Sequence, residues 1–595
     1  MTVLHKLDME ISNSSDKRMT VGQFRDIINN MVKCGSLRSQ NIKPKEILRS
    51  YTVLAGHITE LLIHSTEEID YDTYAFLSVK SQEISTIFSA SGYQSAMHIV
   101  RALGRYDGDN FDIDMKYLPG ACLVLGINEI PNELMSKVLS YLEPKYTVPL
   151  IFGWLSESFV YSEIAEQNRK ILHENIDLIR QAEWNDAYYF AINSVYMFCS
   201  YANFDHRLEL KATINDLLSA KHANYGKLAA PKTSKPGKKP KLVIIHEHFR
   251  STHSMFRCFS PLMEQLRKHF TTIAFAELGH IDDLATPLFD QVRVLGKNRK
   301  FDLRDLINDI NDIAPDIIFY PSIGMSYWAI ILSNFRLAPV QLAGQGHPGS
   351  TMSKVIDYAL INKVKNDPRT FYLEKTIAMD EIGLSLSADF VHEKTKSKQV
   401  QRDYLKIGIN SKLMKLSPEF LKILKEIDLE TETKIEFNFF PAAEGIVNDS
   451  LHAILNLEFK YCCVHNAMHY SDFLRELSSC DFLCAAFPFG NTNGTVDACL
   501  IGIPSFALNG RHFSDQTDSL IIDFFKFPEE LLCDNVDDYK NTVIRMVDDV
   551  DYRNLITKKC RKIDTNEALQ KQIDSKKVAD ALMSTFEDRW NRLDN

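Results

Sequence analysis

The amino-acid sequence predicts an α/β protein, with two doubly wound α/β domains preceded by an all-α N-terminal domain. Apolar residues recur at helical spacing up to about residue 225, and short apolar strands alternate with helical stretches beyond residue 241. At 595 residues the chain is also too long for one hydrophobic core, since such cores stop growing near roughly 250–300 residues. We therefore expect several cores.

Residues 1–225 form the expected all-α domain. Helical periodicity is clearest in residues 44–64, 74–89 and 184–201, and strand-like alternation is scarce. No solenoid period is visible, so a regular helical-repeat array is not predicted. The acidic run 107–114 lacks two of the ligands that a calcium loop requires, and we interpret it as a solvated acidic loop.

Residues 226–241 form a predicted linker, because they contain six lysines and three prolines but no acidic residue. The first α/β domain spans residues 242–400 and the second spans 401–595, with a polar stretch at 387–402 between their strands. Ligand-binding loops of such sheets follow the C-terminal ends of the strands, so two facing sheets suggest a sugar-nucleotide cleft. The expected strands are 242–245, 271–276, 316–320, 340–343 and 357–361, then 405–409, 434–440, 461–464, 481–487 and 503–508.

Composition limits the class of protein and its location. The 68 basic and 78 acidic residues give a net charge of −10, which argues against a general nucleic-acid binder. Eleven cysteines without a CxxC pair favour a reducing compartment. The N-terminal residues lack the apolar core of a signal peptide, and polar residues interrupt the apolar stretch 317–335. We expect a cytoplasmic protein with no membrane span.

The most specific motif is the loop 487–497, FPFGNTNGTVD, between an expected strand and a helix. Gly490 and Gly494 allow the backbone to approach a ligand closely, and the start of the helix can receive phosphate oxygens. Asn491, Thr492 and Asn493 add neutral hydrogen-bonding groups, while Asp497 could accept hydrogen bonds from sugar hydroxyls. The alternative is an ordinary βα turn with a Thr or Asn cap.

Lys415 follows the strand 405–409 and precedes an expected helix start at Ser417 or Pro418. A lysine at this edge of a sheet is well placed to neutralise a diphosphate. The alternative is a solvated surface lysine.

Histidines follow two expected strands of the first α/β domain. His246, His248 and His253 come after the strand 242–245, Ser254 opens the next helix, and His347 lies in a glycine-rich loop. The HxH pair is compatible with a metal hydrolase, and a single histidine with a general base. The later strand ends supply too few metal ligands, so buried or structural histidines are favoured over a metal site.

Five segments within residues 242–532 have the order and composition of a known family. They read EHFRSTHSMFR, PSIGMSYWAIILSNFRLAPVQ, GHP, MKLSPEFL and FPFGNTNGTVD. Together they resemble the cytoplasmic bacterial N-glycosyltransferases that modify high-molecular-weight adhesins. These belong to glycosyltransferase family 41 and are distant relatives of the O-linked N-acetylglucosamine transferases.

The resemblance implies a GT-B fold of two facing Rossmann-like domains and an inverting transfer without a metal cofactor. It implies UDP-glucose as donor and Asn-x-Ser/Thr of a polypeptide, such as an adhesin or autotransporter, as acceptor. The all-α domain and the first Rossmann-like domain would lie on the acceptor side, and the second Rossmann-like domain would bind the UDP-sugar.

The resemblance also assigns roles to residues. Lys415, Asn493 and neighbouring amides of the loop would hold the diphosphate, and Asp497 the sugar. Ser254 and His347 would belong to the donor cleft, and His253 to the acceptor side as a possible base. The chain departs from the family pattern at Met352, at the segment Pro441-Ala442-Ala443, and at Ala467, where a donor-cleft histidine is expected.

Three other functions stay open. An O-glycosyltransferase for Ser/Thr would use the same donor site. A metal-dependent hydrolase would use His246 and His248 but leaves the loop 487–497 without a role. A non-catalytic binding protein would be free to lose Lys415 or Asn493, and both are present.

Overall fold

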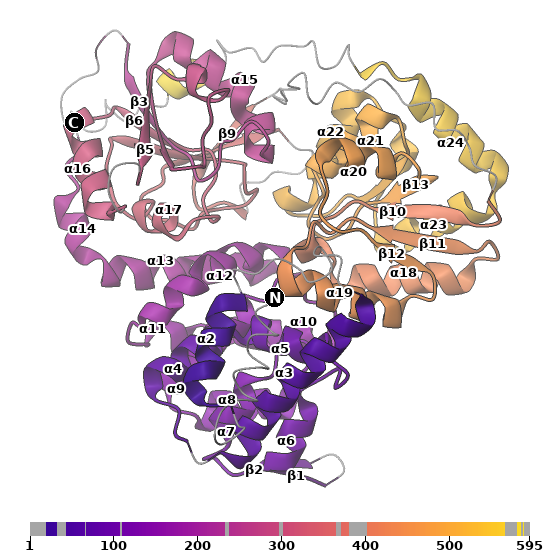
Figure 1. Ribbon diagram of the computed structural model, residues 1–595. Helices are drawn as coiled ribbons and strands as arrows, with labels where there is room; N and C mark the ends of the chain where they lie inside the picture. The colour runs from indigo at the N-terminus through magenta and orange to yellow at the C-terminus, as the bar shows by residue number, and fades with distance from the viewer. Residues whose placement is uncertain are drawn as a thin grey trace.

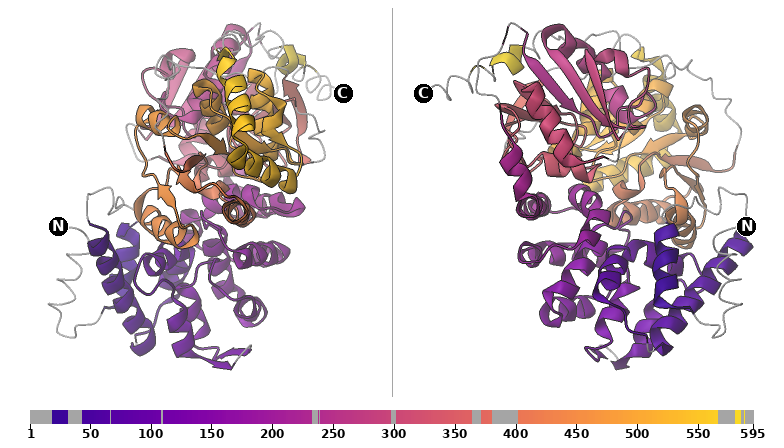
Figure 2. Two further views of the ribbon diagram at one scale, coloured as in Figure 1. Left: turned by 90° about the vertical axis from the view of Figure 1, so that its right-hand side faces the viewer. Right: turned by 60° about the vertical axis from the view of Figure 1, so that its left-hand side comes forward.

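In the computed structural model, a helical domain lies beneath two α/β domains that stand side by side (Figures 1 and 2). The structure describes residues 19–31, 43–65, 67–107, 110–231, 237, 239–296, 301–363, 371–379, 402–565, 580–584 and 587. The predicted fold class is confirmed.

Amphipathic helices build the helical domain. In α3 (Pro44–His64) the buried residues Ile47, Tyr51, Leu54, Ile58 and Leu61 follow a spacing of three or four and form one apolar stripe. Such stripes pack together into the core of the domain. The other α-helices are α2 (Val21–Met31), α4 (Tyr71–Val79), α5 (Ser81–Ser89), α6 (Met97–Leu103), α7 (Leu118–Leu123), α8 (Asn132–Tyr141), α9 (Pro144–Leu155), α10 (Glu163–Glu174), α11 (Asp177–Arg180), α12 (Ile192–Phe198), α13 (Glu209–Lys221) and α14 (Ala223–Leu228).

The helical domain also carries a small β-hairpin, where a solvated loop was expected from the sequence. Strands β1 (Gly104–Asp107) and β2 (Asn110–Ile113) pair in antiparallel register and project from its lower end (Figure 1). The acidic run 107–114 is therefore largely part of a hairpin and not a loop. The two strands are too short and too polar to show the periodicity from which a strand can be predicted.

The first α/β domain contains a seven-stranded parallel sheet in the order β5-β4-β3-β6-β7-β8-β9. Along β3, Leu242 and Ile244 pack with α15, while Val243 and Ile245 join the core shared with α16, α17 and the helical domain. Alternate residues thus serve opposite faces of the sheet. The elements are β3 (Lys241–Ile245), α15 (Ser254–His269), β4 (Thr271–Glu277), β5 (Gln291–Leu295), α16 (Leu303–Ile313), β6 (Ile317–Tyr320), α17 (Tyr327–Leu332), β7 (Val340–Gly344), β8 (Tyr358–Asn362) and β9 (Lys375–Met379).

The second α/β domain contains a six-stranded parallel sheet in the order β12-β11-β10-β13-β14-β15. Its helices cover both faces of the sheet, and Phe482 and Cys484 of β13 lie in one core while Leu483 lies in another. The elements are β10 (Leu405–Ile409), α18 (Pro418–Glu430), β11 (Ile435–Phe439), α19 (Gly445–Glu458), β12 (Cys462–Val464), α20 (Tyr470–Leu477), β13 (Phe482–Cys484), α21 (Asn493–Ile501), β14 (Ser505–Leu508), α22 (Thr517–Phe525), β15 (Leu532–Cys533), α23 (Val536–Asp548) and α24 (Val550–Lys562).

The domain boundaries differ from the predicted ones at two places. Helix α14 runs three residues into the predicted linker 226–241, and β3 begins at the last of its residues. Residues 580–584 are helical, and Leu582 packs into the core of the first α/β domain, so the chain returns there after the second domain. The predicted stretch 387–402 lies almost entirely outside the described residues. None of the described helices combines the length and apolar character that crossing a membrane requires.

Candidate active site

A cavity of about 730 Å³ lies between the two α/β domains and is closed at one side by the helical domain. The helical domain contributes Met197 and Tyr201 to its wall. All nine residues predicted for the site line this cavity: His253, Ser254, His347, Lys415, Asn491, Thr492, Asn493, Gly494 and Asp497. The structure therefore brings together groups that are up to 244 positions apart, from His253 to Asp497.

The loop before α21 is held by hydrogen bonds to the start of α22. Asp518, at the start of α22, accepts bonds from the backbone N–H groups of Asn491 and Thr492, each at 2.7 Å, and from the Thr495 hydroxyl at 2.7 Å. A Cβ at Gly494 would overlap the side-chain amide nitrogen of Asn491 and lie 2.7 Å from the backbone carbonyl oxygen of Asn410, so this position requires glycine. The N-terminus of α21 has no side-chain cap and opens at the cavity. It can therefore receive an anion.

Lys415 is fixed against the same loop. Its Nζ donates to the Gly490 carbonyl at 2.6 Å and to the Asn491 carbonyl at 3.3 Å, and lies 5.1 Å from the centre of the Phe489 ring. Burial lowers its pKa to about 8, and the Asp518 carboxylate counteracts part of that shift. Lys415 is therefore cationic near neutral pH, but close to its titration range.

His253 caps the N-terminus of α15. Its Nδ1 accepts a hydrogen bond from the backbone N–H of Met255 at 3.2 Å. Because a backbone amide can only donate, the ring proton resides on Nε2. Burial and the neighbouring His248, Lys412 and His280 lower the pKa of His253 to about 4. The imidazole is thus neutral, and its free nitrogen is a donor and not a base.

His347 lies where all three domains meet. Its Nε2 is 2.9 Å from the Ser200 hydroxyl of the helical domain, and its ring stacks on Phe489 of the second α/β domain with centroids 5.9 Å apart. Burial holds its pKa well below the usual range. The residue therefore remains a neutral contact at the cavity wall.

Sequence reasoning missed the cationic partner of Asp497. Arg257 of α15 donates from Nη1 to Asp497 Oδ1 at 2.8 Å, and Tyr470 of α20 donates to the same oxygen at 2.5 Å. Arg257 and Tyr470 thus hold Asp497 through the same carboxylate oxygen. Arg257 stands four residues after His253, one helical turn away, and that spacing is the signal that could have found it.

Two further residues at the end of β10 line the cavity and were not singled out. Asn410 donates from Nδ2 to the Gly494 carbonyl at 3.0 Å and accepts a bond from the side chain of Asn491. Lys412 brings a second ammonium group to the wall, and burial lowers its pKa. The segment after β10 therefore supports the loop before α21 from the opposite side to Asp518.

The HxH pair does not form one site. Strand β3 ends at Ile245, so His246 and His248 lie beyond the strand. The rule that residues two apart in a strand point to the same face therefore does not apply to them. The ring of His246 stacks on that of Phe249, with centroids 4.0 Å apart. Both of its nitrogens are buried without a hydrogen-bond partner among the described residues, and burial lowers its pKa to about 3. His248 instead lies against His253 and His280. The described part of the chain contains no cluster of three or more His, Cys, Asp or Glu suited to a metal.

Comparison with known proteins identifies relatives of the chain. A family model described as HMW1 domain 2 matches residues 137–221. The UDP-glucose:protein N-beta-glucosyltransferase of Actinobacillus pleuropneumoniae serotype 5b (strain L20) is 28% identical over 539 residues, covering 86% of this chain and 84% of that protein. Its counterpart in serotype 7 (strain AP76) is 27% identical over 539 residues, again covering 86% of this chain and 84% of that protein.

The chain is a homologue of these protein N-glucosyltransferases. The resemblance that the five motifs indicated is thus confirmed. A solved structure of an O-GlcNAc transferase variant from Thermobaculum terrenum matches with a TM-score of 0.57 and 15% identity, and covers 88% of this chain and 98% of that one. This likeness supports the GT-B arrangement of the two Rossmann-like domains beside a helical domain.

Two of the positions that depart from the family pattern line the cavity. These are Ala442 and Ala467, and at Ala467 a methyl group stands where a donor-cleft histidine is expected. Met352 and Ala442 adopt positive φ values of 54° and 51°, which are uncommon for residues with a side chain.

Proposed function

We propose that the chain transfers glucose from UDP-glucose to asparagine side chains of a polypeptide, in the sequence Asn-x-Ser/Thr. The observation that carries this proposal is the convergence of Lys415 Nζ with the open N-terminus of α21, in a homologue of protein N-glucosyltransferases. The arrangement suits a diphosphate because one fixed cation and one helix N-terminus face the same space.

The donor half of the reaction requires stabilisation of the leaving UDP. Negative charge grows on the diphosphate as the bond from the anomeric carbon to oxygen breaks. Lys415 and the N–H groups at the start of α21 are already oriented toward this charge, which is the arrangement that lowers a barrier most effectively. We propose that these groups take the place of a divalent cation, so that the transfer is metal-independent.

The sugar would lie beside Asp497 and Ser254. Asp497 is held by Arg257 and Tyr470 through Oδ1, and we propose that its carboxylate accepts hydrogen bonds from sugar hydroxyls. Both residues line the cavity. We propose that attack of the acceptor nitrogen on the face opposite the diphosphate inverts the anomeric centre and gives a β-linkage.

The acceptor amide is a weak nucleophile because its lone pair is delocalised, so positioning must supply much of the rate. His253 contributes a neutral N–H from Nε2, since its Nδ1 is occupied by the Met255 amide. We propose that His253 orients the acceptor by donating this hydrogen bond. The amide proton would leave late, after the new C–N bond has formed, to a carboxylate or to water beside the acceptor.

The proposed acceptor is a protein such as an adhesin or autotransporter, modified in the cytoplasm. The ten cysteines among the described residues are all free, which fits a reducing compartment.

Two measurements test the function. Calorimetric titration with UDP, UDP-glucose and UDP-N-acetylglucosamine should show binding of UDP and a preference for the glucose donor. Mass spectrometry should then locate one added hexose on the asparagine of an Asn-x-Thr peptide, and none on a matched Gln-x-Thr peptide. A preference for the acetylated donor, absence of UDP binding, or hexose on the threonine would contradict the proposal.

A further inference from the structure

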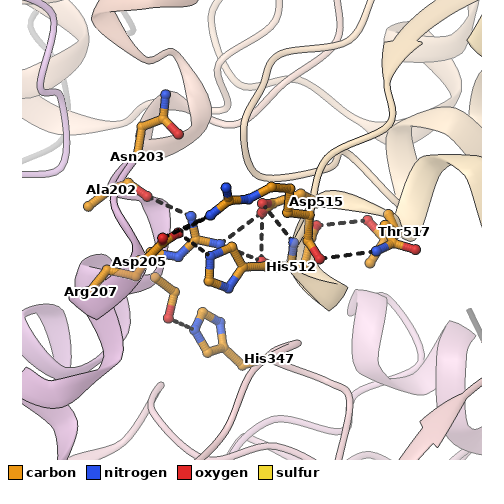
Figure 3. A network of polar contacts seen from close by, with 12 residues as sticks. Ala202, Asn203, Asp205, Arg207, His347, His512, Asp515 and Thr517 are labelled. Carbon is orange, nitrogen blue, oxygen red and sulfur yellow. Dashed lines mark hydrogen bonds and ion pairs between the residues drawn. The ribbon is translucent and has the colours of Figure 1, made fainter. Parts of the chain in front are cut away.

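A short segment of the helical domain makes polar contacts with both α/β domains (Figure 3). We call residues 199–211 the joint segment; it comprises the 3₁₀ helices η3 (Cys199–Tyr201) and η4 (Asp205–Leu208) and the start of α13. Toward the first α/β domain, Ser200 bonds His347. Toward the second, the ring of Tyr201 lies 4.5 Å from that of Phe489. The joint segment therefore contacts a cavity-lining residue of each α/β domain.

Arg207 makes the most deeply buried polar contact of the joint segment with the second α/β domain. It is 2% exposed, and its Nη1 donates to the Ala202 carbonyl at 2.7 Å. Its Nη2 donates to the Ser514 hydroxyl at 3.0 Å and to Asp515 Oδ1 at 2.9 Å. Because both charges lie away from water, the pair depends on these hydrogen bonds and fixes the geometry tightly.

The residues that Arg207 holds are in turn bonded to the loop before α21. Ser514 and Asp515 belong to the 3₁₀ helix η9 (Phe513–Asp515), which leads directly into α22. The Ser514 carbonyl accepts the N–H of Gly490 at 2.9 Å. The hydroxyl of Thr517, two residues after Asp515, accepts a hydrogen bond from the Thr492 hydroxyl at 2.8 Å.

The same short turn also sets the position of Asp518, which accepts the N–H groups of Asn491 and Thr492. Only two residues separate Asp515 from Asp518, so displacement of η9 would displace the start of α22. Lys415 bonds the carbonyls of Gly490 and Asn491 and would shift with them. An unbroken chain of contacts thus joins Arg207 to the groups that face the diphosphate.

We infer that Arg207 of the helical domain is a positioning residue for the UDP-sugar donor, acting through Ser514 and Asp515 on the loop that receives the diphosphate. This inference rests on the proposed function of that loop. It gives the helical domain a part in donor binding, besides the acceptor recognition expected of it from the sequence. Arg207 itself does not line the main cavity, so its effect must pass through η9.

A second arginine at the same interface provides a matched control. Arg511 donates from Nη2 to both carboxylate oxygens of Asp205 in the joint segment, at 2.6 and 2.8 Å. Its side chain is 72% exposed and that of Asp205 is 59% exposed. This pair therefore bridges the same two domains in solvent, where ion pairs contribute little.

The experiment compares Arg207→Met with Arg511→Met in steady-state transfer to an Asn-x-Thr peptide. We expect Arg207→Met to raise the KM for UDP-glucose and the Kd for UDP by about 10-fold or more, because small misplacements of binding groups are costly. The KM for the peptide should stay within about 2-fold of the wild-type value, and Arg511→Met should change none of these constants by more than that.

Arg207→Lys tests the inference if the methionine variant does not fold. It keeps a cation beside Asp515 but cannot hold Ala202, Ser514 and Asp515 in one planar arrangement. We expect a UDP-glucose KM between those of wild type and Arg207→Met, with no change in the Arg511→Lys control.

Other outcomes separate failure of the inference from failure of the proposed function. A merely structural role would lower the active fraction, and so the apparent kcat, while leaving the KM for UDP-glucose unchanged in both Arg207 variants. That result would overturn the inference. Absence of UDP binding and glucose transfer by the wild-type chain would instead contradict the proposed function, on which the inference rests.

Discussion

Arg257 and Asp497 form an ion pair across the cavity, with Arg257 Nη1 2.8 Å from Asp497 Oδ1. Arg257 belongs to α15 of the first α/β domain and Asp497 to α21 of the second. Their side chains are only 4% and 7% exposed. The pair therefore links the two Rossmann-like domains at the point where the sugar is proposed to lie.

Asp497→Asn should destabilise the protein as well as impair transfer. The substitution leaves the Arg257 guanidinium buried without its carboxylate, which typically costs about 3–5 kcal/mol. Urea denaturation followed by tryptophan fluorescence measures this change. Asp472→Asn is the control, since Asp472 pairs with Arg475 in an exposed contact worth roughly 1 kcal/mol or less. Equal, small losses in both variants would contradict the account of this pair.

Lys415→Ala should lower the kcat of transfer by about 100-fold or more, because charge stabilisation of a leaving group is commonly worth roughly 3 kcal/mol. The matched control is Lys422→Ala, which removes a lysine from the exposed face of α18 near Glu163. Circular dichroism should show an unchanged fold for both variants. Activity near the wild-type level in Lys415→Ala would show that this lysine does not balance the diphosphate.

The pH profile of kcat/KM for UDP-glucose should fall on the basic side, as the pH rises through about 8. The Lys415 pKa is lowered to about 8 by burial, so the group is cationic below that value and loses its charge above it. The His253 pKa is lowered to about 4, so this residue stays neutral and adds no acid limb between roughly pH 5 and 7. Lys415→Arg should move the basic limb upward, since arginine keeps its charge. A basic limb that stays near 8 in this variant would exclude Lys415 as its source.

Asp518→Asn should shift the same basic limb to lower pH. The Asp518 carboxylate raises the Lys415 pKa against the larger effect of burial, and the neutral amide removes that contribution. It should also raise the KM for UDP-glucose about 10-fold, because one acceptor for the loop N–H groups becomes a donor. Asp537→Asn in the first turn of α23 serves as a control. An unchanged profile and KM would contradict the role of Asp518 in holding the loop.

Residues that line the cavity could be found from the sequence where the signal is local. The loop 487–497 concentrates glycine, asparagine and threonine between an apolar strand and a helix, and such residues are selected by backbone geometry at that turn. Lys415 could be found because it follows a clear strand and precedes a Ser-Pro helix start. Both signals lie within about a dozen residues of chain.

The contacts that the sequence could not reveal are long-range. In the sequence Arg257 is one of several basic residues in a helix, and nothing nearby marks it. Its partner Asp497 lies 240 positions later and meets it only in the folded chain. Arg207 likewise meets Asp515 only through the fold, 308 positions along the chain. The strands β5 and β9 were missed because they lie at the edges of the sheet, where half-exposed residues weaken the apolar pattern.

The most direct test of the central claim is glucose transfer to an Asn-x-Thr peptide in excess EDTA, with the metal content of the purified protein measured in parallel. We expect undiminished addition of one hexose to asparagine without stoichiometric metal, because Lys415 and the start of α21 supply the positive charge. In this assay His253→Ala should be more damaging per folded molecule than His246→Ala, since only His253 lines the cavity. Stoichiometric metal together with activity abolished by EDTA would contradict metal-independent transfer and favour a metal-dependent enzyme that uses His246 and His248.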